Sequence, residues 1–251
     1  MDRLTGKVAI ITGGEGSIGM ATARAFVAEG ASVFLAGISA PGLEAGAAAL
    51  GGRAAWQVTD VTSSAQVKAA VEAAVERFGR LDVVIANAGI KGATDPIAEY
   101  PEDSFDQTLA VHVRGAFLLA KHAVPHLSVG ASIIFTSSVV GLTAAPYIAG
   151  YSTAKHAQVG LMRTIAAELA PRGIRVNTIH PGPVSNEFQH VVEEAATGAD
   201  RETAASIFNG MIPLGRHAAP EEIARSMLFL ASEDSSFMTG ATLAVDGGMS
   251  S

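Results

Sequence analysis

Three residues in the middle of the chain have the types and the spacing that acid-base chemistry at an alcohol or carbonyl oxygen requires. Tyr151 and Lys155 are four positions apart in a segment with helical periodicity, so both side chains lie on one helix face. A free phenol has a pKa of about 10, and a neighbouring ammonium group is expected to lower it by stabilising the phenolate. Ser138 follows an apolar run that predicts a buried strand. Together these groups predict proton transfer to or from a substrate oxygen.

A glycine-rich turn close to the N-terminus has the composition of a phosphate-binding loop. The segment Thr12-Gly13-Gly14-Glu15-Gly16-Ser17-Ile18-Gly19 follows an apolar run and leads directly into a helical pattern. Small residues let the backbone turn tightly and approach a pyrophosphate, whose charge is stabilised by free amide groups at the helix N-terminus. A turn in this setting predicts a dinucleotide cofactor.

The end of the second predicted strand bears on the choice between NAD and NADP. Many dinucleotide sites have a carboxylate there for the adenosine ribose, whereas this strand ends Leu35-Ala36-Gly37-Ile38-Ser39 and has none. It also offers no Arg or Lys to a 2′-phosphate, which Glu15 in the turn would repel. An unpaired dianion costs more than a lost ribose hydrogen bond. The sequence therefore favours NAD(H) by a small margin, with NADP(H) as the alternative.

These residues need a scaffold that brings several strand ends together. Alternating strand and helix signals predict a doubly wound α/β fold, a Rossmann-type parallel sheet with helices on both faces. An eightfold barrel is the rival topology, but only about six or seven strand signals are visible and the first strand leads into a phosphate turn. A short surface helix is expected in the alanine-rich residues 44–55, ending at Gly51-Gly52. Strands are predicted at residues 8–11, 33–35, 83–85, 133–135 and 176–179, and helices at 18–28, 64–78, 105–127 and 151–170.

Length and composition predict one domain over residues 1–251. With 49% apolar residues the chain can close one large core. A net charge of -7 without a basic run argues against a nucleic-acid partner. The absence of cysteine excludes disulfides, thiolate nucleophiles and cysteine-ligated metals, and it is compatible with a cytoplasmic location. No secretory signal or membrane-spanning run is recognisable, so no membrane association is expected.

Residues 185–210 differ in character from the rest of the chain. They include aromatic, paired aliphatic and acidic residues and are interrupted by Thr197-Gly198-Ala199-Asp200, which predicts helical pieces joined by a mobile turn. We interpret this segment as a substrate lid.

Taken in chain order, several motifs resemble those of the short-chain dehydrogenase/reductase family. They are the glycine-rich turn, Asn87-Ala88-Gly89, Ser138, the Tyr151 to Lys155 segment and Pro181-Gly182. Asp60-Val61 and the closing Val245-Asp246-Gly247-Gly248 extend the resemblance over nearly the whole chain. The resemblance implies an NAD(P)-dependent oxidoreductase that interconverts a secondary alcohol and a ketone by direct hydride transfer, without a metal.

The same resemblance implies individual roles. Tyr151 would be the general acid/base, Ser138 would hydrogen-bond the same substrate oxygen, and Lys155 would bind the nicotinamide ribose while lowering the Tyr151 pKa. Substrate contacts are expected from Ser138, Val140, Tyr151 and Phe188. Cofactor contacts are expected from Gly13, Ser17, Ile18, Gly19, Gly37, Asp60, Val61, Asn87, Ala88, Gly89, Tyr151, Lys155, Pro181, Gly182, Val184 and Asn186.

The chain departs from the family pattern at three positions. Ser17 stands where a second glycine is more usual in the turn, and Asn186 stands where a threonine often meets the nicotinamide amide. His112 replaces an asparagine that helps a water chain reach the lysine. An imidazole can also relay a proton, so His112 is a candidate fourth catalytic residue, with a structural role as the alternative.

The expected substrate surroundings are mostly apolar. They favour a neutral alicyclic, aromatic or steroid-like alcohol or ketone, with sugar and acyl-carrier substrates as alternatives. The residues are Ile90, Val139, Val140, Leu142, Tyr147, Phe188 and Phe208.

The sequence also bears on two other classes of function and on the oligomeric state. A non-catalytic cofactor-binding sensor of the same fold would not need the intact Ser138, Tyr151 and Lys155. A hydrolase using Ser138 would need a nucleophile elbow that the surrounding sequence lacks. The helices at 105–127 and 151–170 have more apolar positions than one sheet face can cover, and similar family members pair them, so a homotetramer is expected.

Overall fold

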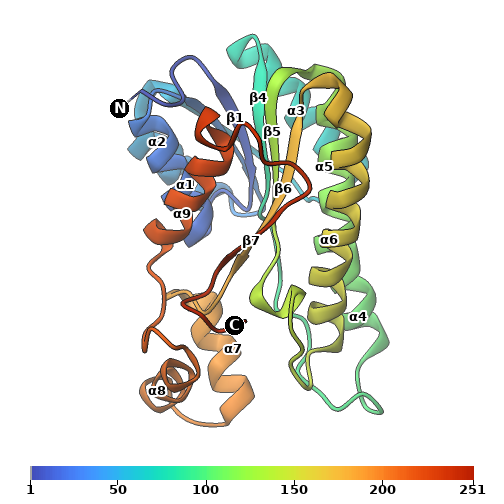
Figure 1. Cartoon of the computed structure of the whole chain (residues 1–251), viewed down its shortest axis with the longest axis vertical. Helices are drawn as coiled ribbons and strands as arrows, with labels where there is room; N and C mark the ends of the chain where they lie inside the picture. Colours follow the sequence, from blue (N-terminus) through green and yellow to red (C-terminus); the bar gives the residue numbers. More distant parts are fainter. Residues whose placement is uncertain (1) are drawn as a thin grey trace.

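A seven-stranded parallel sheet forms the centre of the molecule, a computed structural model that describes residues 2–251 (Figure 1). The strand order β3-β2-β1-β4-β5-β6-β7 extends in both directions from the β1 and β4 pair, which confirms the doubly wound fold and excludes the barrel. The strands are β1 (Val8–Thr12), β2 (Ser32–Gly37), β3 (Ala54–Val58), β4 (Leu81–Ala86), β5 (Leu127–Thr136), β6 (Arg175–Pro181) and β7 (Thr242–Val245).

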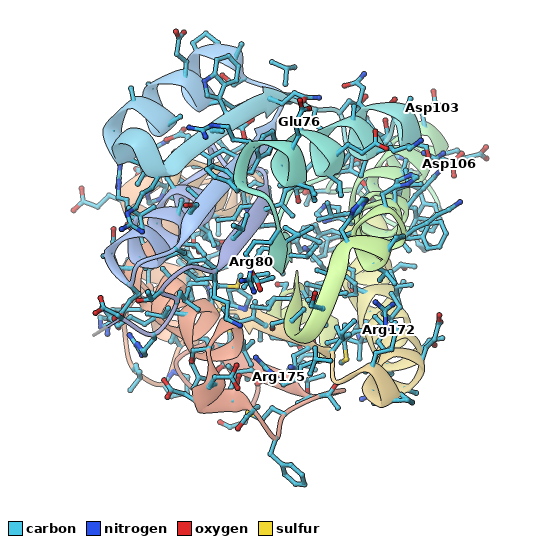
Figure 2. All side chains as sticks on the ribbon, turned by 90° about the horizontal axis from the view of Figure 1, so that it is seen from above. Glu76, Arg80, Asp103, Asp106, Arg172 and Arg175 are labelled. Atoms are coloured by element: carbon cyan, nitrogen blue, oxygen red, sulfur yellow. The ribbon has the colours of Figure 1, made fainter. Side chains whose placement is uncertain are left out.

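Helices cover both faces of this sheet and create two cores. Helices α1, α2 and α9 lie on one side of the sheet, and α3, α5 and α6 lie on the other (Figure 1). Seen from above, Glu76, Asp103 and Asp106 lie along an outer side of the molecule, on α3 and α4 (Figure 2). The helices are α1 (Ser17–Ala28), α2 (Ala40–Leu50), α3 (Ser64–Phe78), α4 (Glu102–Leu109), α5 (Gly115–Ala123), α6 (Ala149–Leu169), α7 (Glu187–Thr197), α8 (Arg201–Met211) and α9 (Pro220–Ala231).

Strands β1 and β4 at the centre of the sheet are mostly apolar because both of their faces are buried. In β1, Val8 and Ile10 belong to the core beneath α3, α5 and α6, whereas Ala9 and Ile11 belong to the opposite core. Successive side chains of a strand point to opposite faces, so a strand covered on both sides has apolar residues at neighbouring positions. This is why the sequence showed continuous apolar runs rather than alternation.

The predicted helix over residues 105–127 was wrong in its extent. The chain forms α4, a π-helical turn over Ala110–Arg114 and then α5, which ends at Ala123. Pro125 lies in a short 3₁₀ turn after α5, because a proline has no amide hydrogen for continuing an α-helix. Leu127 begins β5 rather than ending the helix. The π-helical turn contains His112, and such turns are frequent at functional sites.

Two further segments refine the sequence-based boundaries. The alanine-rich helix is α2, which begins earlier than expected, at Ala40, and ends at Leu50 before Gly51. The end of that stretch starts β3, the edge strand at one side of the sheet. The segment 185–210 forms α7 and α8, joined through Gly198, which has a left-handed backbone at φ 66°.

Candidate active site

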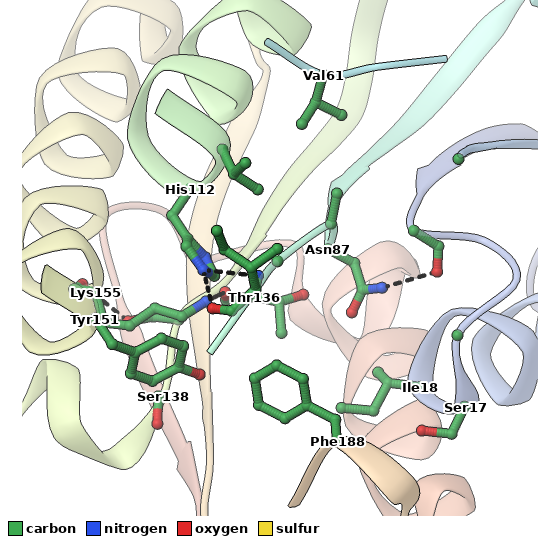
Figure 3. A pocket seen from close by; sticks show the side chains of 18 of the residues that line it. Ser17, Ile18, Val61, Asn87, His112, Thr136, Ser138, Tyr151, Lys155 and Phe188 are labelled. Carbon is green, nitrogen blue, oxygen red and sulfur yellow. Dashed lines mark hydrogen bonds between the residues drawn. The ribbon is translucent and has the colours of Figure 1, made fainter. Parts of the chain in front are cut away.

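A cleft of about 680 Å³ opens where β1, β2, β4, β5 and β6 end (Figure 3). Ligands of open α/β sheets bind at the carboxyl ends of the strands, where the connections diverge. Every residue expected at the cofactor lines this cleft except Gly19, and the expected catalytic residues Ser138, Tyr151, Lys155 and His112 line it too. Among the expected substrate contacts, Phe188 lines the cleft and Val140 does not.

The glycine-rich turn presents the open N-terminus of α1 to the cleft. Gly16 is the N-cap residue and supplies no side-chain cap, so the first-turn amides are available to an anion. A Cβ on Gly19 would lie 2.3 Å from the Gly13 carbonyl oxygen, which explains why a glycine is needed behind the turn. Gly13 itself has φ 62°, a backbone that side chains rarely adopt.

Asn87, which follows β4, holds this turn from the side. Its amide Nδ2 donates to the carbonyl oxygens of Thr12 at 3.2 Å and Gly13 at 3.3 Å. The Thr12 hydroxyl in turn accepts hydrogen bonds from the backbone amides of Asn87 and Ala88. The two loops are therefore linked by both side chains and backbone, which fixes the shape of the cleft floor.

Tyr151, Lys155 and Ser138 meet at the other end of the cleft. Tyr151 and Lys155 lie in the first turns of α6, and Ser138 follows β5 and hydrogen-bonds the Tyr151 phenol. Lys155 is 3% exposed; its Nζ lies 5.3 Å from the centre of the Tyr151 ring and donates to the Thr136 carbonyl oxygen at 2.7 Å. The structure thus places these three side chains in one cleft.

The expected lowering of the Tyr151 pKa is not what this environment produces. Burial raises the pKa of Tyr151 to about 12, and the hydrogen bond with Ser138 opposes that rise only in part. Burial also lowers the pKa of Lys155 to about 7, which weakens its hold on a positive charge at neutral pH. In the protein without bound cofactor, the loss of hydration shifts both pKa values more than the Lys155 charge and the Tyr151 phenol shift each other's.

The serine loop after β5 is anchored by residues that the sequence did not single out. The Ser137 hydroxyl donates to the Lys155 carbonyl oxygen at 2.9 Å, and His180 Nδ1 lies 2.8 Å from the Ser138 carbonyl oxygen. Burial lowers the pKa of His180, so the neutral imidazole is favoured and can donate through Nδ1. These bonds join β5, β6 and α6 behind the Ser138 hydroxyl.

His112 is buried beside Tyr151, with its ring edge-on to the phenol at a centroid distance of 5.3 Å. Burial, followed by the nearby Lys155 charge, lowers the pKa of His112 to about 3, so the imidazole is neutral. Its Nε2 lies 2.7 Å from the Ile90 carbonyl oxygen and 3.1 Å from the Ile90 amide nitrogen. The shorter contact is a hydrogen bond when Nε2 carries the proton. Nδ1 then remains an acceptor, and it has no partner within residues 2–251.

The backbone of His112 is also held. Its carbonyl oxygen accepts a hydrogen bond of 2.9 Å from Gln158 Nε2, on the inward face of α6. Gln158 is 1% exposed, so this bond joins the π-helical turn to α6 away from water. Four residues of separation from Ala154 and seven from Tyr151 place Gln158 on the face of α6 that carries Tyr151, a signal that was present in the sequence.

The N-terminal end of α7 borders the cleft. Asn186 is the N-cap of α7, where its Oδ1 accepts from the Gln189 amide at 2.8 Å, while its Nδ2 donates to the Ser17 hydroxyl at 2.9 Å. Two positions at which the chain departs from the family pattern therefore contact each other. Phe188 faces Tyr151 with 6.4 Å between ring centres (Figure 3).

Fewer apolar residues than expected line the cleft near Tyr151. Ile90 and Phe188 line the cleft, whereas the remainder of the expected apolar set does not, and Tyr147 and Leu142 are exposed. Sequence reasoning also missed several residues that line the cleft, because they lie in loops, in helices or at the end of β5 and belong to no motif. They are Thr59, Thr62, Gln107, Ala110, Val111, Thr136, Ser137 and Gln189.

Residues 2–251 contain no group of three or more histidine or acidic side chains arranged to hold a metal ion. No helix in the same range combines the length and the apolar character that crossing a bilayer requires.

A model of one protein family matches residues 13–250, under the description enoyl-(acyl carrier protein) reductase. The chain is 38% identical to the 3-oxoacyl-(acyl-carrier-protein) reductase FabG of Thermotoga maritima over 252 aligned residues, with 98% of this chain and 99% of the relative covered. The chain belongs to the short-chain dehydrogenase/reductase family. It is thus a member of an oxidoreductase family that uses nicotinamide cofactors.

Solved structures agree with this assignment. Levodione reductase superposes with a TM-score of 0.95 at 35% identity, with 99% of both chains covered. NAD+-bound xylitol dehydrogenase gives 0.93 at 34% identity, covering 98% of this chain and 100% of that one. A blue fluorescent protein in complex with NADPH gives 0.90 at 32% identity, covering 99% and 100%. The similar structures therefore include both an NAD and an NADP complex.

Proposed function

We propose that the chain interconverts a secondary alcohol and a ketone with a nicotinamide cofactor, with Tyr151 as the general acid/base. The observation that carries the proposal is the meeting of Tyr151, Ser138 and Lys155 in the same cleft as the uncapped N-terminus of α1. The cleft volume of about 680 Å³ falls within the usual range of small-molecule sites. The glycine cradle at Gly13 and Gly19 fits the close approach of a pyrophosphate.

The protein's own groups would handle the proton. When bound, the cofactor supplies or accepts the hydride at the substrate carbon. In ketone reduction Tyr151 donates its phenolic proton to the developing alkoxide, and Ser138 hydrogen-bonds the same oxygen. In alcohol oxidation Tyr151 must first lose that proton, so positive charge beside the phenol is required to offset the burial that raises its pKa to about 12. Lys155 is the protein group placed to contribute that charge.

His112 would support this chemistry as a neutral hydrogen-bond acceptor or as part of a proton relay. Its pKa of about 3 rules out a stable imidazolium at neutral pH, so we assign it no charge of its own. The unpartnered Nδ1 would accept a hydrogen bond from a water molecule near Lys155. In this proposal His112 is a positioning residue for Lys155 and Tyr151, in place of the asparagine usual in the family.

NAD(H) is the favoured cofactor, because the adenosine end of the cleft has no cationic side chain for a 2′-phosphate. Gly16, Gly37 and Ile38 line that end without charge, and Glu15 is anionic. Ile90 and Phe188 provide an apolar surface near Tyr151, which supports a neutral, largely apolar alcohol or ketone as substrate.

The proposal includes the behaviour of the lid and the assembly. The α7–α8 segment would close over the substrate, since Phe188 already reaches toward Tyr151 from it. Phe117 on the outer face of α5 is 44% exposed, which supports pairing of these helices in a homotetramer. The lack of cysteine agrees with a reducing cytoplasm.

The test combines binding with labelled turnover. NADH and NADPH are titrated by nucleotide fluorescence, and a panel of alicyclic and aromatic ketones is then reduced with cofactor deuterated at the nicotinamide C4. We expect deuterium at the carbinol carbon of the product, measured by mass spectrometry. Nucleotide binding without turnover of any secondary alcohol or ketone would instead favour the sensor, and a lack of nucleotide binding would refute both functions.

A further inference from the structure

The carboxylate of Glu15 lies at the end of β2, although Glu15 belongs to the turn after β1. Its Oε1 accepts hydrogen bonds from the backbone amides of Ile38 at 2.8 Å and Ser39 at 3.1 Å. Ser39 is the N-cap of α2, so the carboxylate is close to the positive end of that helix dipole. Three favourable interactions thus fix an acidic group on a strand end where the sequence has no acidic residue.

Gly37 provides the space for this arrangement. An ideal Cβ on Gly37 would lie 1.9 Å from Glu15 Oε2 and 2.4 Å from its Cδ. Any side chain at position 37 would therefore displace the Glu15 carboxyl group. The Glu15 carboxylate occupies the volume that a side chain at position 37 would fill. Its position therefore depends on the glycine at position 37.

The Glu15 carboxylate also has hydrogen-bonding capacity that the protein does not use. A carboxylate offers about four acceptor positions, and Oε2 has no partner within residues 2–251 although it is buried. Glu15, Gly37 and Ile38 all line the cleft, together with Asp60 and Val61. An unsatisfied carboxylate oxygen beside a cleft is a ready acceptor for a ligand hydroxyl.

We propose that Glu15 recognises the adenosine ribose by accepting a hydrogen bond from its 2′-hydroxyl, in place of the missing strand-end carboxylate. The inference rests on the proposed function, because it requires a dinucleotide in this cleft. It goes further in making Glu15 an attractive contact for NAD as well as a repulsive one for NADP. It also explains why position 37 is a glycine, since a side chain there would displace the Glu15 carboxyl group.

The experiment measures dissociation constants of the full-length protein for NADH, 2′-deoxy-NADH and NADPH by nucleotide fluorescence. Wild type should bind NADH more tightly than 2′-deoxy-NADH by about tenfold to a hundredfold, the range for a hydrogen bond to a charged group. Glu15→Gln keeps the shape of the side chain but removes its charge, and it should reduce that ratio to within about threefold of unity. Glu44→Gln, on the exposed side of α2, removes one charge elsewhere and should keep the wild-type ratio.

A relocation pair makes the test specific to this geometry. Gly37→Asp alone should weaken NADH binding, because its Cβ collides with the Glu15 carboxyl group. Glu15→Ala combined with Gly37→Asp should bind NADH more tightly than Gly37→Asp alone and should recover the preference over 2′-deoxy-NADH. Unfolding midpoints of all variants, measured alongside, identify any variant that is not folded.

The outcomes distinguish failure of the Glu15 contact from failure of the proposed function. If wild type binds NADH but the Glu15→Gln ratio equals that of wild type, Glu15 does not recognise the ribose and only this inference is overturned. The same holds if Gly37→Asp binds NADH as well as the double variant does. If wild type binds none of the three nucleotides, the proposed function fails as well.

Discussion

Acidification should destabilise the folded chain through His112, and the size of the effect follows from its burial. The His112 pKa is about 3 in the folded protein, against about 6.5 for an exposed histidine in the unfolded chain. The unfolded chain therefore binds more protons between these values, so stability is full above about pH 6.5 and falls as pH decreases toward 3. Each pH unit in that window costs about 1.4 kcal/mol, which gives about 2 kcal/mol between pH 8 and pH 5.

The assay is urea unfolding at pH 8 and pH 5, at one protein concentration, for wild type and His112→Asn. We expect the free energy of unfolding of wild type to fall by about 2 kcal/mol more than that of His112→Asn, since asparagine does not titrate. The exposed His126 provides a matched control, and His126→Asn should show the wild-type pH dependence. Equal losses for wild type and His112→Asn, within about 0.5 kcal/mol, would show that burial of His112 does not hold its imidazole neutral.

Three further predictions concern the cradle, the sheet and the assembly. Gly19→Ala should weaken NADH binding at least about tenfold, because its Cβ would lie 2.3 Å from the Gly13 carbonyl oxygen. Gly160→Ala, where a Cβ would meet no atom within 4 Å, should leave NADH binding unchanged, and fluorescence titration with NADH measures both affinities. Asp82→Ala should lower the free energy of unfolding by about 1–3 kcal/mol, because the buried carboxylate accepts from the Val8 amide and pairs with Arg80; intact NADH binding separates this from a site effect. Light scattering should give about 102 kDa, four times the chain mass of 25.6 kDa, and a concentration-independent monomer would contradict the tetramer.

The fold and the proximity of Tyr151 and Lys155 were predictable because their signals are local. Strand and helix periodicity, the glycine-rich turn and the spacing of Tyr151 and Lys155 each need only a few neighbouring residues. The split of the predicted helix at 105–127 was not predictable in the same way, because the π-helical turn at His112 satisfies long-range bonds to Ile90 and Gln158. Such contacts exist only after the chain has folded.

The pKa shifts in the site and the position of the Glu15 carboxylate were not predictable from the sequence, because they depend on burial and on contacts between residues far apart in the chain. The spacing of Tyr151 and Lys155 indicated a favourable charge interaction, but the directions of their pKa shifts follow from how much protein surrounds them, which spacing does not reveal. The sequence shows that β2 does not end in an acidic residue. The carboxylate found at that strand end belongs to Glu15, which precedes Gly37 by 22 residues in the chain. Only the three-dimensional arrangement connects these two residues.

In the proposed reaction Tyr151 transfers the proton during alcohol and ketone interconversion. The most direct test is the turnover rate of Tyr151→Phe, with NADH affinity determined on the same preparation. We expect a loss of about two to four orders of magnitude in turnover, with affinity within about threefold of wild type because the ring still packs against His112 and Phe188. A Tyr151→Phe variant that keeps more than about a tenth of wild-type turnover would show that another group is the acid/base.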